Sequence, residues 1–210
     1  IPATHLLTTK DIVYRCKAAD IVGIICVDDD AVMTHVDEAA VSAPTLRYRA
    51  YVRSVHADAS INPAKNRPAA FEGRNLEWQD FNLAVAGASA HFSRPTGQEG
   101  TSNDDIMLLY FTSGTTGMPK MVRHDFTYPL GHIVTAKYWQ QVKKGGLHLT
   151  VADTGWAKAA WGKIYGQWLS ECAVFVYDYD RFVPSAMLEV VSRHRVTSFC
   201  APPTVYRFFI

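Results

Sequence analysis

The stretch 110–120 combines the residue types that could hold a polyanion. It reads Tyr-Phe-Thr-Ser-Gly-Thr-Thr-Gly-Met-Pro-Lys and directly follows an apolar run. Glycines let backbone N–H groups turn toward a ligand and approach it closely, hydroxyl groups donate further hydrogen bonds, and a lysine adds positive charge. We therefore expect a loop that binds phosphate groups, and a triphosphate suits it best.

The same stretch departs from the Walker A loop of P-loop NTPases. Gly114 and Lys120 have the Walker A spacing, but Pro119 stands at the second glycine position and Met121 at the magnesium-binding Ser/Thr position. A conventional P-loop NTPase is therefore disfavoured. The alternative without a ligand is a flexible, hydroxyl-rich hairpin turn, the usual interpretation of an isolated Ser/Thr/Gly cluster. The full string favours phosphate binding.

Residues 112–120 match the signature Thr-Ser-Gly-Thr-Thr-Gly-x-Pro-Lys, and on this string the sequence resembles the adenylate-forming superfamily of AMP-binding acyl-CoA synthetases. Further segments look like the medium-chain acyl-CoA synthetase branch, namely 1–4 with 10–12, 153–156, 161–163, 177–180 and 199–207. The resemblance spans most of the chain and is weakest between about residues 30 and 100.

The resemblance implies an AMP-forming acid–thiol ligase. A carboxylate attacks the α-phosphate of ATP to give an acyl-adenylate and pyrophosphate, and the thiol of coenzyme A then displaces AMP. Because the carboxylate and the triphosphate are both anionic, the loop and Mg²⁺ must neutralise the β- and γ-phosphates. The resemblance assigns the ATP phosphates to Thr112, Ser113, Gly114, Thr115, Thr116, Gly117 and Lys120, and assigns no metal ligand and no certain catalytic residue to this chain.

Trp156 resembles the aromatic residue that shapes the floor of the acyl pocket in this superfamily. A large flat side chain there would limit the length of the carboxylic acid by its volume. The alternative is a tryptophan on a helix that packs in the hydrophobic core, since aromatic side chains are commonly buried for packing alone.

The chain lacks other parts of the superfamily's active site. It contains no Thr-Glu pair, and therefore not the aromatic-Gly-x-Thr-Glu motif whose glutamate helps to hold magnesium, and it has no Thr-Gly-Asp segment. The hinge and the C-terminal lid are also missing, and both ends of the chain look cut. We therefore expect a fragment of the large N-terminal domain with little or no ligase activity by itself. The alternative is a free-standing, non-catalytic module that binds a nucleotide or an acyl group.

Other polar residues are weaker candidates. His124 and Asp125 are neighbours and would point apart in a strand, and no nucleophile accompanies them or His132. We therefore expect these side chains either at the surface or in contact with site residues but not with a ligand. The acidic groups at 28–30 and at 178–180 lack the spacing of a calcium loop, and solvated turns are the better interpretation.

The pattern of apolar residues predicts an α/β fold with a largely parallel sheet covered by helices on both faces. Residues 1–93 form a first α/β segment, 94–103 a linker rich in Pro, Gly and Ser, and 104–210 an α/β segment that carries the loop. The predicted helices are 8–20, 76–88, 129–141, 156–169 and 184–194. The predicted strands are 21–27, 48–56, 106–111, 147–152, 173–177 and 197–201, and 62–68 is expected to be a loop.

Composition excludes several classes of protein. The 210 residues are 48% hydrophobic, which allows a sizeable core, and 21 basic against 20 acidic residues argue against general binding of nucleic acid or anionic membranes. No apolar run is long enough to span a membrane. The four cysteines lack metal-site spacing and are expected to be buried thiols in a reducing compartment, the cytoplasm. The expected partners are a carboxylic acid, ATP and coenzyme A; the oligomeric state stays open.

Overall fold

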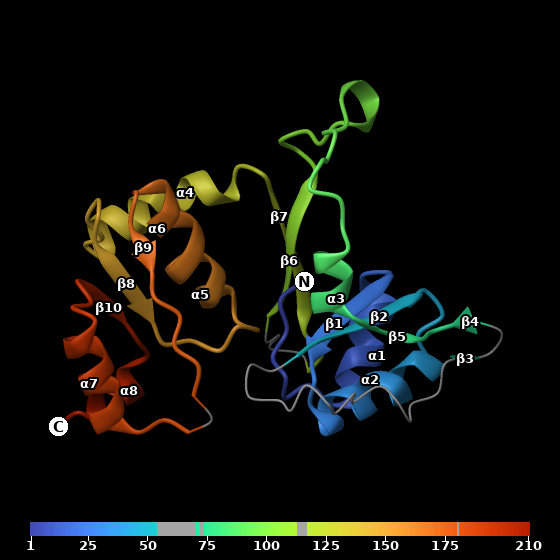
Figure 1. Cartoon of the computed structure of the whole chain (residues 1–210), viewed down its shortest axis with the longest axis horizontal. Coiled ribbons are helices and arrows are strands. Elements are labelled where there is room, and N and C mark those ends of the chain that lie inside the picture. The colour runs from blue at the N-terminus through green and yellow to red at the C-terminus, as the bar shows by residue number, and fades with distance from the viewer. Residues whose placement is uncertain (54–69, 72–73, 113–116, 180) are drawn as a thin grey trace. The chain divides into compact units, whose positions relative to one another are not determined.

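The computed structural model describes residues 1–53, 70–71, 74–112, 117–179 and 181–210 (Figure 1). They form two compact units, which we call the N-terminal unit (His5–Gly97) and the C-terminal unit (Ile1–Thr4 together with Gln98–Ile210). The division after Gly97 lies within the segment 94–103. Residues 1–4 group with the C-terminal unit, which differs from the expected first segment 1–93.

The N-terminal unit is built on a parallel three-stranded sheet with the order β1–β2–β5. The strands are β1 (Gly23–Val27), β2 (Tyr48–Val52) and β5 (Trp78–Asp80), and β3 (Ala70–Phe71) pairs with β4 (Arg74–Asn75) in a short hairpin. The helices are α1 (Thr9–Ala18), α2 (Asp30–Val41) and α3 (Phe81–Ala86).

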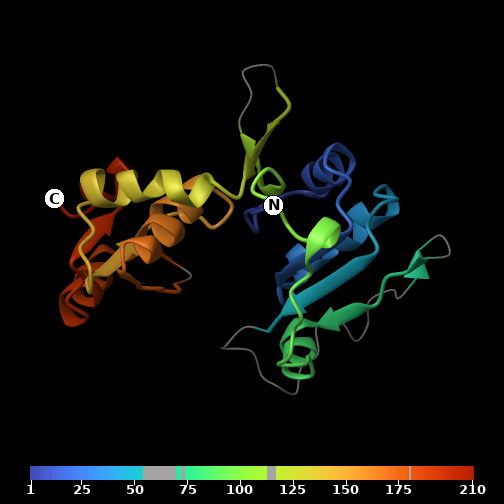
Figure 2. The same ribbon diagram turned by 90° about the horizontal axis from the view of Figure 1, so that it is seen from above.

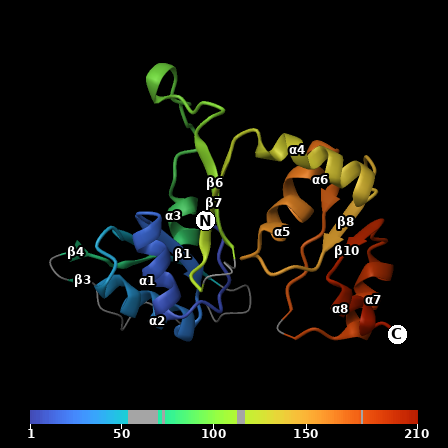
Figure 3. The same ribbon diagram turned by 180° about the vertical axis from the view of Figure 1, so that it is seen from behind.

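Helices α1 and α2 pack side by side on one face of the sheet (Figure 3), and their side chains form the core of this unit. Ile12 and Cys16 of α1 meet Val36 of α2, and Ile24 of β1 packs against this cluster. The opposite face of β1 is open, because the side chain of Ile25 is 58% exposed. The expectation that helices cover both faces is therefore wrong for this strand.

Helix starts in this unit follow local capping chemistry. Thr8 caps α1, and its hydroxyl and the Asp11 carboxylate form a reciprocal capping box. Asp29 caps α2 by accepting hydrogen bonds from Ala31 N and Val32 N at 2.9 and 3.0 Å. The predicted solvated turn at 28–30 is thus the start of a helix that the sequence interpretation missed.

The C-terminal unit contains a second parallel sheet with the order β10–β8–β9. Its strands are β8 (Leu147–Thr150), β9 (Ala173–Val174) and β10 (Ser198–Cys200). An antiparallel hairpin of β6 (Ile106–Thr112) and β7 (Lys120–Asp125) precedes it. The helical elements are η1 (Gly97–Glu99), α4 (Tyr128–Val134), η2 (Thr135–Trp139), α5 (Ala157–Ala160), η3 (Trp161–Tyr165), α6 (Gly166–Leu169), α7 (Pro184–Arg193) and α8 (Pro203–Arg207).

Two helical segments of this unit contain a π-helical turn. Helix α4 continues into η2, which is π-helical, and the two form one rod (yellow in Figure 2). Helix α5 continues through the π-helical η3 into α6. The predicted helices 129–141 and 156–169 are therefore present, but each changes its hydrogen-bond pattern partway along.

The α/β class with parallel sheets and helices is confirmed, with three corrections. The strand at 106–111 pairs with β7 in an antiparallel hairpin and not in a parallel sheet. The predicted helix 76–88 begins only at Phe81, because Trp78–Asp80 extends the sheet and Asp80 caps α3 by accepting from Leu83 N at 3.0 Å. Helix α8 was not predicted. The predicted loop 62–68 lies outside the described residues.

Candidate functional site

The phosphate-loop candidate connects the two strands of the β6–β7 hairpin. Thr112 and Lys120 are partners in the hairpin register, and the Thr112 hydroxyl donates to the Lys120 carbonyl oxygen at 3.4 Å. The hairpin thus brings the first and last residues of the predicted loop together. Ser113, Gly114, Thr115 and Thr116 lie outside the described residues, so their contacts with phosphate stay a prediction.

The described part of the loop faces solvent. Thr112, Gly117, Met118 and Lys120 are exposed. Gly117 has a φ of +101°, which side chains rarely adopt, and no atom of the described residues, its chain neighbours aside, lies within 4 Å of the position a Cβ would take there. A glycine is therefore favoured at this position by its backbone conformation.

Strand β7, and not a helix, follows the loop. A Walker A loop leads into a helix whose N-terminus faces the phosphates, so the hairpin excludes that geometry and agrees with the substitutions at Pro119 and Met121. A hairpin is also what the interpretation without a ligand predicts, so the strands alone do not separate these two alternatives.

Trp156 ends a tight turn that follows strand β8. Its backbone N–H donates to the Asp153 carbonyl oxygen at 3.0 Å, and the N–H of Gly155 donates to the Asp153 carboxylate at 2.7 Å. Asp and Gly favour such turns because the carboxylate bonds its own backbone two residues on and glycine has no Cβ. The Trp156 side chain is 60% exposed. This exposure contradicts the core-packing alternative and leaves the ring available to contact a ligand.

A buried polar network lies behind that turn and was not predicted. The carbonyl oxygen of Gly162 in η3 accepts hydrogen bonds from the side chains of Thr150, Gln140 and Gln167, at 2.5, 2.8 and 3.1 Å. The His148 Nε2 atom lies 3.1 Å from the same oxygen. The network therefore joins strand β8 to η3, the elements before and after the turn.

The contacts of His148 favour one tautomer. Nε2 lies 2.8 Å from the Thr150 hydroxyl oxygen and 3.1 Å from the Gly162 carbonyl oxygen, and Nδ1 lies 2.6 Å from the Ser198 hydroxyl oxygen. Because the carbonyl oxygen can only accept and the Thr150 hydroxyl already donates to it, we assign the proton to Nε2 and let Nδ1 accept from Ser198. The side chain is fully buried. Burial lowers the pKa of His148, the Gly162 carbonyl partly opposes this, and the charge of Lys163 lowers the pKa further. His148 and Thr150 are two residues apart on one face of an apolar strand, which is the sequence signal that could have revealed the network.

Asp125 and the two histidines considered for acid/base chemistry have different partners. Asp125 accepts from the backbone N–H and the hydroxyl of Thr127, at 2.9 and 2.6 Å, and these bonds lower the pKa of Asp125. The rings of His124 and His132 instead both pack against the Tyr128 ring, with ring centroids 4.3 and 4.4 Å away. Burial lowers the pKa of His132 and raises that of Tyr128. These groups pack together as an aromatic cluster.

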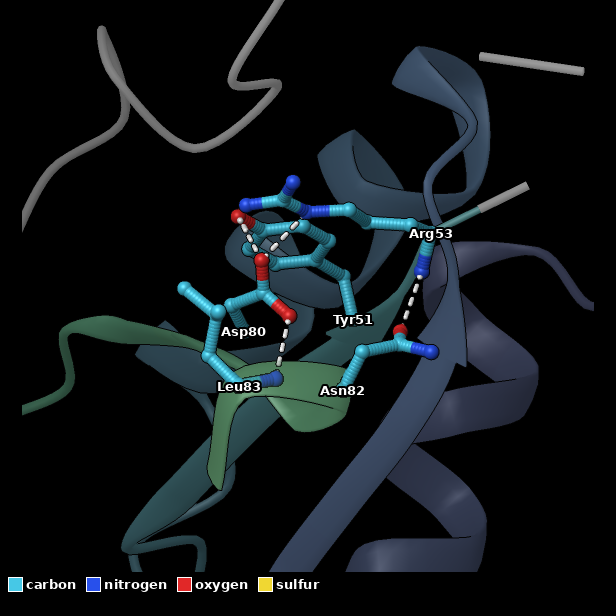
Figure 4. Close-up of polar contacts among 5 residues, drawn as sticks. All are labelled: Tyr51, Arg53, Asp80, Asn82 and Leu83. Carbon is cyan, nitrogen blue, oxygen red and sulfur yellow. Dashed lines mark hydrogen bonds and ion pairs between the residues drawn. The ribbon is translucent and has the colours of Figure 1, made fainter. Parts of the chain in front are cut away.

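The N-terminal unit has a polar cluster at the carboxyl ends of β2 and β5 (Figure 4). Arg53 Nε donates to Asp80 Oδ2, which also accepts from the Tyr51 hydroxyl at 3.4 Å. Asp80 Oδ1 caps α3 at Leu83, and the Arg53 N–H donates to Asn82 Oδ1 at 3.0 Å. Both carboxylate oxygens are engaged within the protein. The cluster therefore ties α3 to the sheet.

Within the described ranges, no group of three or more His, Cys, Asp or Glu side chains is arranged to hold a metal ion. The same residues include no helix long and apolar enough to cross a membrane. Cys16, Cys172 and Cys200 are buried free thiols as expected, and Cys26 is half-buried. Burial raises the pKa of the Cys16 and Cys172 thiols.

The fold of the chain is similar to that of two solved enzymes. The crystal structure of the Brucella canis acyl-CoA synthetase matches 99% of this chain and 33% of that chain, with a TM-score of 0.74 and 18% identity. The anthranilate CoA ligase AuaEII, solved in complex with anthranoyl-AMP, matches 92% of this chain and 33% of that one, with a TM-score of 0.69 and 17% identity.

The chain belongs to the AMP-binding enzyme family, whose sequence profile matches residues 1–210. It is 30% identical over 211 residues to the human mitochondrial acyl-coenzyme A synthetase ACSM3 and 33% identical to the mitochondrial ACSM5 of Rattus norvegicus. Each alignment covers 100% of this chain and 32% of the relative. The chain thus spans about a third of the length of these relatives. The match to the family profile confirms the resemblance drawn from the motifs of the chain.

Proposed function

We propose that this chain is the part of an AMP-forming acyl-CoA synthetase that holds the ATP phosphates and one wall of the acyl pocket. The overall reaction converts a carboxylic acid, ATP and coenzyme A into acyl-CoA, AMP and pyrophosphate. The observation that carries the proposal is the string 112–120, which matches the superfamily signature within a chain matched by the family profile from end to end. Its described residues Thr112, Gly117 and Lys120 are exposed.

The loop would act on the first step. A carboxylate oxygen forms a bond to the α-phosphorus, the bond from that phosphorus to the bridging oxygen breaks, and pyrophosphate leaves. Backbone N–H groups around Gly117 and the ammonium group of Lys120 would neutralise the phosphates that become pyrophosphate. In the second step the sulfur of coenzyme A bonds to the acyl carbon and AMP leaves with the electrons of the broken C–O bond.

Trp156 would contact the acid and not the nucleotide. Its exposed ring, held by the turn that starts at Asp153, supplies a flat apolar wall. Magnesium is implied by the superfamily, but the described residues offer no cluster of ligands for it, so no step is assigned to a metal held by this chain. The second candidate is a module that binds ATP or an acyl group without catalysis, and the 210-residue chain by itself is expected to behave in this way.

Lys120 provides the test of nucleotide binding. In the full-length protein that contains this chain, Lys120→Ala should raise the KM for ATP about tenfold or more, because a charge-assisted hydrogen bond is lost, whereas Lys120→Arg should retain part of the affinity. Lys144→Ala is the matched control, since Lys144 forms an exposed ion pair with Glu171 at 2.7 Å.

Pyrophosphate release with butyrate and with benzoate measures the reaction itself. Release that depends on a carboxylate supports the ligase. Binding of ATP without release from any carboxylate supports the non-catalytic module, and an unchanged response to ATP in Lys120→Ala contradicts the assignment of the loop. The cytoplasm remains our proposal for the compartment, on the basis of the reduced cysteines, although the relatives named above are mitochondrial.

A further inference from the structure

The first residues of the chain lie against the turn that carries Trp156. Residues 1–4 belong to the C-terminal unit, and the hydroxyl of Thr4 donates to Asp153 Oδ2 at 2.8 Å. These two residues are 149 positions apart in the sequence. The N-terminal segment (residues 1–4) is therefore joined to the turn by a specific polar contact.

Asp153 connects this segment to the turn with the two oxygens of one carboxylate. Oδ2 accepts from Thr4, while Oδ1 accepts from the N–H of Gly155 at 2.7 Å. The carbonyl oxygen of Asp153 also accepts from the N–H of Trp156 at 3.0 Å. A shift of the Thr4 hydroxyl would thus act on the carboxylate that shapes the backbone immediately before Trp156.

Gly155 shows how closely the two segments pack. A Cβ at Gly155 would lie 2.0 Å from Thr4 N and 2.5 Å from the carbonyl carbon of Ala3. Both of these are backbone atoms, so the N-terminal segment occupies the space that any side chain at position 155 would need. The glycine is required by this contact and not by a positive φ.

We propose that Thr4 and Asp153 are positioning residues that set the place of the Trp156 ring, so that the N-terminal segment helps to determine which carboxylic acids fit the acyl pocket. This inference rests on the proposed function of Trp156. Small changes in the position of one wall alter the accepted size of an apolar substrate, because binding of an apolar group depends on close packing.

The test compares Thr4→Val with Thr4→Ser in the full-length protein. Valine keeps the shape of threonine but removes the hydroxyl, so the ratio of kcat/KM for benzoate to that for butyrate should change about fivefold, the effect of one lost hydrogen bond. The KM for ATP should stay within about twofold, because Lys120 and its loop are untouched. Thr4→Ser keeps the hydroxyl and should restore the wild-type ratio.

Thr9→Val is the matched control, because the Thr9 hydroxyl donates to Glu38 at 2.6 Å at an exposed site in the N-terminal unit. It loses one threonine hydroxyl, as Thr4→Val does, and should leave the ratio unchanged. An unchanged ratio in Thr4→Val, or the same change in Thr9→Val, would overturn the inference.

A second measurement does not depend on activity. In the 210-residue chain, the indole N–H signal of Trp156, assigned by its loss in Trp156→Phe, should shift in Thr4→Val and Gly155→Ala and return to its place in Thr4→Ser. If no carboxylate supports pyrophosphate release by the wild type, the proposed function fails and the indole signal alone decides whether residues 1–4 position the ring. An indole signal at the wild-type position in both Thr4→Val and Gly155→Ala refutes the positioning role.

Discussion

His148→Gln should make the stability of the C-terminal unit less dependent on pH. The imidazole is fully buried, donates from Nε2 to the Gly162 carbonyl and accepts at Nδ1 from Ser198. A glutamine amide has a donor and an acceptor of its own and carries no titratable proton. The substitution therefore removes the titration of the side chain while keeping hydrogen-bonding groups at the site.

The sign follows from the lowered pKa of His148. In the unfolded chain a histidine has a pKa of about 6.5. Below that pH the unfolded state binds a proton that the folded state rejects, so the contribution of His148 is complete above about pH 6.5 and is lost as the pH falls toward the lower folded pKa. The loss amounts to at most about 1.4 kcal/mol per pH unit, the free energy of one proton.

Urea unfolding between about pH 5 and about pH 7.5 measures this slope. Tryptophan fluorescence reports mainly on the C-terminal unit, which holds four of the five tryptophans of the chain. The lowered pKa of His132 acts in the same direction, so a smaller slope should remain in His148→Gln. His91→Gln, at an exposed position of the N-terminal unit, is the control for the substitution itself.

The reasoning would be refuted if the free energy of unfolding of His148→Gln fell with acid as steeply as that of the wild type. Such a result would mean that protonation of His148 costs the folded state nothing, which is incompatible with its desolvation. If the slope is unchanged and the free energy of unfolding is also lower at every pH, glutamine fails to fit at position 148 and the proton of His148 has no role in stability.

Three further substitutions test the packing within the two units. Asp37→Ala removes the carboxylate paired with the fully buried Arg49, and should lower the free energy of unfolding of the N-terminal unit by about 3–5 kcal/mol in urea, followed by circular dichroism. Gly166→Ala places a Cβ 2.3 Å from the His132 carbonyl oxygen, and should cost about 1–3 kcal/mol in thermal unfolding. At Gly131 no atom of the described residues outside its own helix and its chain neighbours lies within 4 Å of the Cβ position, so Gly131→Ala should instead stabilise its helix by about 0.5–1 kcal/mol. Equal effects of the two glycine substitutions would contradict the close helix packing.

Features that depend on neighbouring residues could be predicted from the sequence. Thr8, the first residue of the predicted helix 8–20, closes a capping box with Asp11, and the start of α1 follows from these two side chains. Helix α2 carried an equally local signal, because Met33, Val36 and Ala40 are buried at helical spacing. It was missed because the acidic residues before it were interpreted as a turn and not as a cap.

Features that depend on distant pairing could not be predicted in the same way. The apolar strand ending at Thr112 is correct, but an alternation of strands and helices does not say that its partner is the next strand, β7, in an antiparallel arrangement. The π-helical turn η3 occupies the same residues that an α-helix would. The carbonyl oxygen of Gly162 accepts from Thr150 of β8 and from Gln140, which directly follows η2, only after the unit has folded.

The two parts of the candidate site differ in the same respect. The phosphate loop is recognisable because its chemistry is contained in consecutive residues, ending in Lys120, and a hairpin is enough to hold the ends of the loop together. The turn that leads to Trp156, by contrast, depends on Asp153, whose carboxylate accepts a hydrogen bond from Thr4, 149 positions away in the sequence. A candidate phosphate loop can therefore be predicted from consecutive residues alone, whereas the residues that we propose to affect the choice of acid are found only through contacts between distant segments.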